Sequence, residues 1–220
     1  MSVESDVQSG ARAAAERAAA AAPAGNPALL GLITFIPSGI TLGLWFVGYL
    51  DTAALPGGMI PIVTFSAGLF LMISAVSALS VGASSVAAIF GVFSAFWISF
   101  GVLVFSLNNG LIINATDGSA LTTAQVGNIQ GAYLLSFLIV FVIMTLGTLR
   151  LPLAFTVGFV LVCITFALAF LGVSTGNAGL FPIAGIATFL FCAVFAYILL
   201  DGLGQDLGGR AMPMGSALQK

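Results

Sequence analysis

Six long apolar stretches, free of Lys, Arg, Asp, Glu and His, constrain the fold of this chain more than any other feature of its sequence. They cover approximately residues 28–50, 57–79, 86–107, 130–149, 152–173 and 178–200. The core of a bilayer is about 30 Å thick, and a helix rising about 1.5 Å per residue needs roughly 20 apolar residues to cross it. Strands of a membrane barrel are about 10 residues long and alternate in polarity, unlike these stretches. The sequence therefore predicts an all-α, polytopic membrane protein with six transmembrane helices.

The composition excludes several classes of function. Charged residues make up only 5% of the chain, whereas about a quarter of the residues of a soluble domain are charged. The net charge of −2 and the lack of a basic cluster argue against binding to nucleic acid. Without histidine or a carboxylate in the apolar stretches, neither a hydrolytic site nor a metal centre can be assembled. We therefore expect no enzymatic activity, no metal site and no cofactor.

The two cysteines, Cys163 and Cys192, both lie inside apolar stretches. Their spacing matches neither a disulfide framework nor a metal-binding motif. A free cysteine in such surroundings usually behaves as a small hydrophobic side chain. We expect both thiols to be part of the helix packing.

The chain divides into a membrane domain and two tails. Residues 1–25 contain both charges and many alanines but no apolar core of a secretory signal, which predicts a cytoplasmic N-terminal tail. Residues 26–200 are expected to form the six-helix transmembrane domain. Residues 201–220 are expected to form a C-terminal tail on the same side of the membrane.

The basic residues predict the orientation of the chain in the membrane. With six spans, both chain ends lie on one side, and five basic residues fall there: Arg12, Arg17, Arg150, Arg210 and Lys220. The opposite side receives only Asp51 and Asp117 as charged residues, the latter in the long polar connection 108–129. Because positive residues accumulate in cytoplasmic loops, we expect both termini of this multi-pass protein of the cell membrane to face the cytoplasm.

Small residues and prolines inside the stretches predict how the helices touch. Gly39 and Gly43 are separated by three residues, a spacing that lets helix backbones approach closely in a membrane. Pro37, Pro61 and Pro182 fall within the predicted spans, where each would remove a backbone hydrogen bond and kink its helix. These patterns indicate tight packing and leave the oligomeric state open.

The lack of titratable residues in the spans restricts any coupling to protons. Proton-coupled transporters relay protons through buried Asp, Glu or His, so a proton crossing here would have to travel on the substrate. A carboxylic acid with a pKa near 4.3 is neutral in about one molecule in 500 at pH 7, and in about one in six at pH 5. We accordingly expect Asp51, Asp117 and Asp201 to be dispensable for proton-linked uptake.

Several motifs occur in an order that is found in a known family. The first span opens with NPALLGLITF (26–35), the third contains FGVFSAFW (90–97), and the tail carries GRAMPMG (209–215). Between them lie GTL (147–149), FALAFLG (166–172) and AGIATFLFCAVFAY (184–197). In residues 26–216 the chain resembles the acetate uptake transporter family, which comprises the bacterial succinate–acetate permeases and their fungal acetate/ammonia-export relatives.

The resemblance implies six helices in a bundle around a narrow path, assembled as a homo-hexamer, and uptake of acetate, or in some members succinate, linked to protons. Matched residue by residue, the constriction of that path falls on Phe35, Phe93 and Val162. The family usually has tyrosine in place of Phe93 and leucine in place of Val162. Asn26, at the start of the first helix, is expected to face the path, and Trp97 to line it. The expected partners are a small carboxylate, protons and the lipid bilayer.

Three functions therefore remain open from the sequence. The leading hypothesis is a channel or proton-linked permease for acetate or another small monocarboxylate. A passive pore for a small neutral solute, such as urea, an amide or ammonia, is the first alternative. A membrane subunit that transports nothing and stabilises a partner through its small-residue faces is the second.

Overall fold

The computed structural model describes residue 8, residues 25–51 and residues 57–219, so almost all of the expected N-terminal tail (1–25) lies outside the described residues. The described part is built from α2 (Pro27–Phe46), η1 (Ile62–Leu69), α3 (Phe70–Ser80), α4 (Ser84–Asn108), α5 (Thr123–Thr148), α6 (Leu153–Thr175) and α7 (Leu180–Asp206). Within it, six helical stretches are long and apolar enough to cross a membrane, η1 and α3 together forming the second. The predicted all-α, six-helix membrane fold is confirmed.

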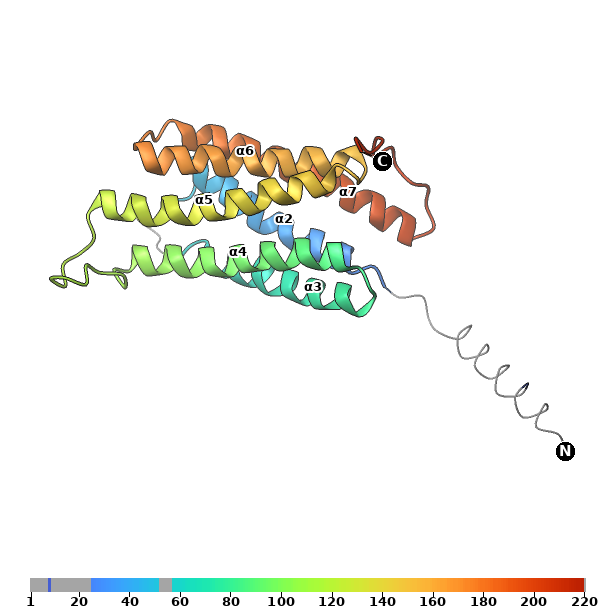
Figure 1. Cartoon of the computed structure of the whole chain (residues 1–220), viewed down its shortest axis with the longest axis horizontal. Coiled ribbons are helices and arrows are strands. Elements are labelled where there is room, and N and C mark those ends of the chain that lie inside the picture. Colours follow the sequence, from blue (N-terminus) through green and yellow to red (C-terminus); the bar gives the residue numbers. More distant parts are fainter. Residues whose placement is uncertain (1–7, 9–24, 52–56, 220) are drawn as a thin grey trace.

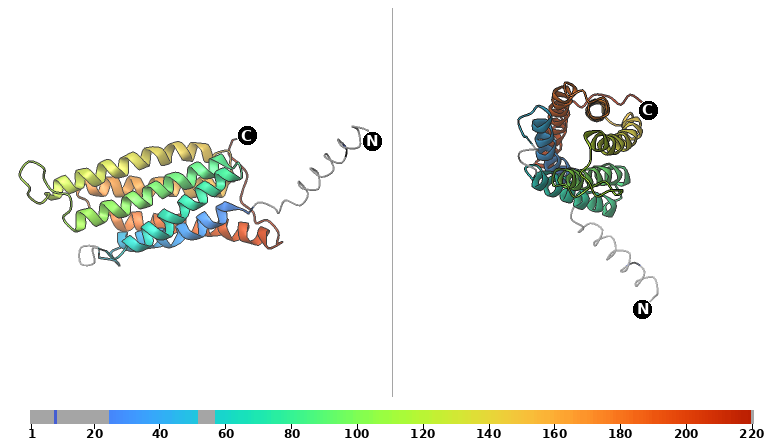
Figure 2. Two further views of the ribbon diagram at one scale, coloured as in Figure 1. Left: turned by 90° about the horizontal axis from the view of Figure 1, so that it is seen from below. Right: turned by 90° about the vertical axis from the view of Figure 1, so that its left-hand side faces the viewer.

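The helices run side by side along one long axis (Figure 1). In chain order they pack α2 against η1 and α3, α3 against α4, α5 against α6 and α6 against α7, while α7 returns to α2. Seen end-on, they are arranged around a common axis (Figure 2). We call the end of the bundle where α2 begins and α7 finishes the terminal end, and the opposite end, which carries the α4–α5 connection, the loop end.

The fourth membrane helix starts at Thr123, seven residues before the apolar stretch that predicted it. Thr122 and Gln125 form a capping box: the Gln125 N–H donates to Thr122 Oγ1 at 3.3 Å, and the Thr122 N–H donates to Gln125 Oε1 at 2.8 Å. The preceding connection carries Asp117, which accepts a hydrogen bond from the Ser119 N–H that lowers the pKa of its carboxyl group. The hydropathy pattern omitted the first turns of this helix because their side chains are polar. A helix can nevertheless extend beyond the bilayer core, where polar side chains are tolerated.

The last helix also exceeds the predicted span and ends at Asp206. The predicted boundary at residue 200 therefore cuts through α7, and the predicted absence of acidic residues from the membrane helices does not hold for it. Asp201, which the sequence places just beyond the last apolar stretch, is a buried carboxylate in this helix, with only 8% exposed. A helix can continue through a charged residue when hydrogen-bond donors compensate for its burial, as they do here.

The π-helical segment η1 is held between two neighbouring helices by serine side chains. Ser38 of α2 donates to the Ile62 carbonyl at 3.0 Å and accepts from the Ala67 N–H at 3.2 Å. Ser94 of α4 donates to the Gly68 carbonyl at 2.7 Å. Irregular backbone at membrane depth requires protein partners for its polar groups, and these serines supply them.

Of the three prolines expected to kink membrane helices, one lies in a helix interior. Pro37 is inside α2. Pro61 directly precedes η1, and Pro182 is the third residue of α7. The first N–H groups of a helix have no partner within that helix, so Pro61 and Pro182, which lack an N–H, remove no helical hydrogen bond. The expected loss of a backbone hydrogen bond therefore does not apply at those two positions.

Close approach between α2 and α7 depends on glycine. A Cβ atom added at Gly185 would lie 2.7 Å from Val47 Cγ1 and 3.1 Å from the Gly43 carbonyl oxygen, which belongs to the backbone and cannot rotate away. The predicted close contact at Gly39 and Gly43 is present, because a Cβ at Gly39 would meet the Cys192 sulfur at 2.5 Å. The small residues thus serve the packing of helices within one chain.

We expect Gly185→Ala to lower the thermal unfolding midpoint of the detergent-solubilised protein, with a loss of about 1–3 kcal/mol from overpacking. Gly204→Ala is the matched control in the same helix, since nothing lies within 4 Å of a Cβ there. Alanine favours helix over glycine by about 1 kcal/mol, so this control should leave the midpoint unchanged or raise it. Equal midpoints for the two variants would contradict the close contact.

Candidate functional site

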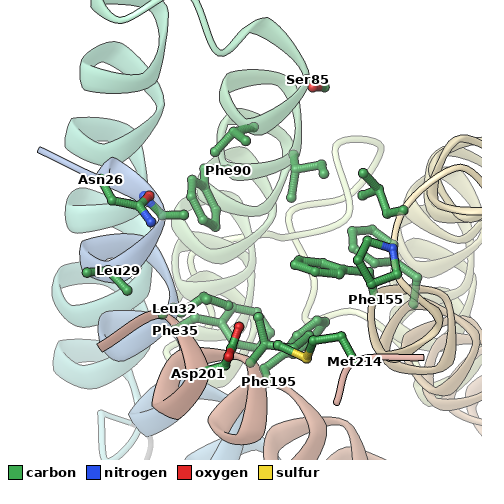
Figure 3. Close-up of a pocket in the computed structure, with 18 of the residues that line it drawn as sticks. Asn26, Leu29, Leu32, Phe35, Ser85, Phe90, Phe155, Phe195, Asp201 and Met214 are labelled. Atoms are coloured by element: carbon green, nitrogen blue, oxygen red, sulfur yellow. The ribbon is translucent and has the colours of Figure 1, made fainter. Parts of the chain in front are cut away.

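A cavity of about 330 Å³ opens at the terminal end of the bundle. Its walls come from the starts of α2, α4 and α6, the end of α7 and the chain that follows α7, and they include Asn26, Leu32, Phe90, Phe155, Asp201 and Met214 (Figure 3). One water occupies about 30 Å³ in the liquid, so this terminal cavity has room for a small organic molecule with several waters. Its walls are mostly apolar, with a few polar groups, as in most small-molecule sites.

A second, smaller cavity of about 70 Å³ lies towards the loop end. It is lined by the opposite ends of the same helices together with α5, including Trp45, Phe46, Phe100, Gln130, Tyr133 and Phe181. Tyr133 is held there by a hydrogen bond from its hydroxyl group to the Phe96 carbonyl at 2.7 Å. The two cavities thus approach each other from opposite ends of the bundle.

A cluster of buried aromatic side chains, which we call the aromatic plug, separates the two cavities: Phe35, Phe93, Trp97, Phe191 and Phe195. The Phe35 ring is central, with centroids 5.1 Å from Phe93, 5.9 Å from Trp97 and 5.4 Å from Phe195. Phe35, Phe93 and Phe195 form the inner wall of the terminal cavity. Trp97 contacts Phe100 of the loop-end cavity, with 6.3 Å between ring centroids. The plug therefore lies between the two cavities.

The structure brings three of the predicted path residues together. Phe35, Phe93 and Trp97 meet in the plug, because Phe93 and Trp97 are one helical turn apart and point the same way. Asn26 lies at the outer wall of the terminal cavity, where its side chain also caps α2 by accepting from the Ala28 N–H at 3.0 Å. Val162 is 1% exposed in the core of α6 and lines neither cavity.

The plug contains a polar atom without a partner. Trp97 Nε1 is buried, and no hydrogen-bond acceptor reaches it within the described chain. Most buried donors in proteins are paired, so an orphaned one requires an explanation. Here it is a donor that a polar group passing through the plug could meet.

Sequence reasoning missed the contribution of the chain after α7 to the wall of the terminal cavity. The chain after α7 folds back as a segment that we call the C-terminal strap (residues 210–219). The Met214 carbonyl accepts from the Ala154 N–H at the start of α6 at 3.0 Å, and the Gln219 N–H donates to the Leu149 carbonyl at the end of α5 at 2.8 Å. The GRAMPMG motif was the available signal, but nothing in it indicates that Met214 reaches the cavity wall.

Within the described residues, no group of three or more Cys, Asp or Glu side chains is placed to hold a metal ion. Asp201 is the one charged residue among those that line the terminal cavity. Burial, aromatic contacts and a few amide and hydroxyl groups therefore define the site. Such a site can filter a small solute by size and charge.

Comparison with known proteins agrees with this arrangement. The model of the GPR1/FUN34/yaaH family matches residues 8–206. The chain belongs to that family. The resemblance to acetate uptake transporters is thereby confirmed. The structure of the bacterial acetate channel SatP is similar to this family member, with a TM-score of 0.74 and 25% sequence identity over 87% of this chain and 99% of that one. Comparison with curated proteins finds no match.

Proposed function

We propose that this protein is a membrane channel or permease for acetate or another small monocarboxylate. The observation that carries the proposal is the pair of opposed cavities with an aromatic plug between them. The similarity to an acetate channel over 87% of the chain supports it. Succinate is a larger candidate that would have to fit through the same plug.

In this proposal the substrate enters the terminal cavity and passes the plug when the Phe35 and Phe93 rings move apart. The Trp97 indole N–H is the donor available to its carboxyl oxygen on the way. The Phe159 ring of α6 packs against Phe93 and Phe195 of the plug, with centroids 5.8 Å and 6.2 Å away, and Val162 is one turn further along α6. The substrate carries its own proton, because the described residues of the plug are not titratable.

We further propose that the terminal end faces the cytoplasm of the cell membrane. Arg150 and Arg210 lie at this end, and the sequence outside the described residues contains Arg12, Arg17 and Lys220. Cytoplasmic loops attract basic residues, so the distribution supports cytoplasmic termini. An inward-facing terminal cavity would then deliver its contents to the cytoplasm.

A homo-hexamer is the proposed assembly. Only 17% of the most apolar part of α5 is buried inside the described chain, against 39–50% for the other five membrane helices. A helix face so open within one chain is available to lipid or to a neighbouring copy. The mass of the detergent-solubilised complex distinguishes six copies from one.

Uptake of labelled acetate into proteoliposomes tests the proposed function. We expect uptake at pH 5 that exceeds the uptake of protein-free liposomes, and that is inhibited by filling the terminal cavity with Leu32→Trp. Permeation of labelled urea or of a labelled small amide without dependence on pH would instead identify a passive pore for neutral solutes. Absence of flux for acids and neutral solutes alike would favour a membrane subunit without transport activity.

A further inference from the structure

The Asp201 carboxylate lies in the wall of the terminal cavity (Figure 3). It is on α7, on the same helix face as Phe195 and Ile198, which line the same cavity. Asp201 is six positions beyond Phe195 of the plug in α7, a helical rise of about 9 Å. A substrate that moves between the mouth of this cavity and the plug therefore passes close to the carboxylate.

The C-terminal strap fixes Asp201 in this position. Its Oδ1 accepts from the Met212 N–H at 2.6 Å, and its Oδ2 accepts from Gln205 Nε2 at 2.8 Å. The strap is itself anchored next to Met212, because the Tyr197 hydroxyl donates to the Pro213 carbonyl at 2.9 Å. Both carboxylate oxygens are thus held by neutral donors.

No positive charge compensates for Asp201 among the described residues of the cavity wall. The lining residues from α2, α4, α6, the α5–α6 connection and the strap are all neutral. Arg150 and Arg210 are exposed at the same end and do not line the cavity. Asp206, further along α7, is also exposed and outside the lining. Asp201 therefore carries the only formal charge among the described residues that line the cavity, and that charge is negative.

A fixed negative charge acts differently on the two forms of a carboxylic acid. Coulomb repulsion disfavours the anion, and it is strong where protein replaces water around the pair. The neutral acid carries no net charge and does not experience this repulsion. An apolar wall with one carboxylate consequently favours the protonated form.

We propose that Asp201 is a specificity-determining residue that excludes the anionic form of the substrate from the path. This inference rests on the proposed function and names the residue that selects the form of the acid. It also revises the expectation from the sequence: Asp201 is not needed to relay a proton, yet its charge decides whether the substrate must carry one. The strap contributes by holding the carboxylate at the cavity wall.

Charge removal at Asp201 tests the proposal. Asp201→Asn keeps the size of the side chain and an oxygen that can accept from the Met212 N–H. In proteoliposomes, two rates are measured for each variant: acetate anion flux driven by a membrane potential at pH 7.5, and acetate uptake at pH 5.5. We expect the ratio of anion flux to acid uptake to rise at least about tenfold, which corresponds to about 1.4 kcal/mol.

Two further variants make the result specific to charge at this position. Asp201→Glu retains the charge and should keep the ratio low. Asp206→Asn removes an exposed carboxylate from the same helix and should leave the ratio unchanged. Gln205→Lys leaves the Asp201 carboxylate in place but replaces the neutral donor to its Oδ2 by a positively charged group, so it should offset the negative charge and raise the ratio even if Asp201→Asn does not fold.

An unchanged ratio in both Asp201→Asn and Gln205→Lys, with acetate transport intact in the unmodified protein, overturns this inference alone. A ratio that rises as much in Asp206→Asn as in Asp201→Asn also overturns it, because the effect is then one of surface charge. Absence of acetate flux through the unmodified protein overturns the proposed function, and this inference with it.

Discussion

Phe93→Ala is expected to increase acetate uptake about tenfold and to admit larger acids such as butyrate. The Phe93 ring lies in the wall of the terminal cavity and contacts Phe35 and Phe141, with centroids 5.1 Å and 4.7 Å away. Its removal opens the plug from the side of α4, and the barrier falls by about 1.4 kcal/mol for a tenfold rate. The measurement is the initial rate of uptake of labelled acetate and butyrate into proteoliposomes.

The control for Phe93→Ala must separate an open path from a weakened fold. Loss of a buried phenylalanine costs about 3–5 kcal/mol of stability, on or off the path. Phe166 is equally buried and packs against Phe96 and Phe141, but it lines neither cavity. Phe166→Ala should therefore show a similar loss of thermal stability with unchanged selectivity. Unchanged uptake and selectivity in Phe93→Ala would remove Phe93 from the path.

The second large effect is the dependence of uptake on pH. If only the neutral acid passes, uptake at a fixed total acetate concentration should fall about 80-fold between pH 5 and pH 7, in proportion to the fraction protonated. The decrease follows from the titration of the substrate: acid with a pKa near 4.3 loses its proton as the pH rises through and above that value. Initial rates at half-unit intervals of external pH measure the slope.

Acetic acid also crosses lipid without protein, so the control is part of the prediction. Rates from protein-free liposomes are subtracted at every pH, and Leu32→Trp, which fills the terminal cavity, supplies a folded protein with the path closed. A protein-dependent rate that stays constant from pH 5 to pH 7 would show that the anion is the transported form. That result would contradict both the neutral-acid mechanism and the role of Asp201.

Much of the fold could be predicted from the sequence. A polypeptide in hydrocarbon must satisfy its backbone groups internally, so six charge-free stretches of more than about 20 residues leave few alternatives to six helices. The encounter of Phe93 with Trp97 also follows from the sequence, because helical periodicity places them on one face. Phe35 joins them only because α2 lies beside that face, an arrangement that the family resemblance implied and that no local pattern contains.

The rest was decided by contacts between distant parts of the chain. Hydropathy describes which residues tolerate lipid, but α5 begins before its apolar stretch and α7 ends after its own, where caps and hydrogen bonds set the limits of a helix. The sequence predicted Asp201 to be the start of a polar tail, because the donor that holds its carboxylate, the Met212 N–H, is 11 residues further along the chain. The sequence by itself determined six membrane helices, whereas only tertiary structure decided that the chain after them returns to the cavity and holds a carboxylate in its wall, because that return depends on contacts between residues far apart in the sequence.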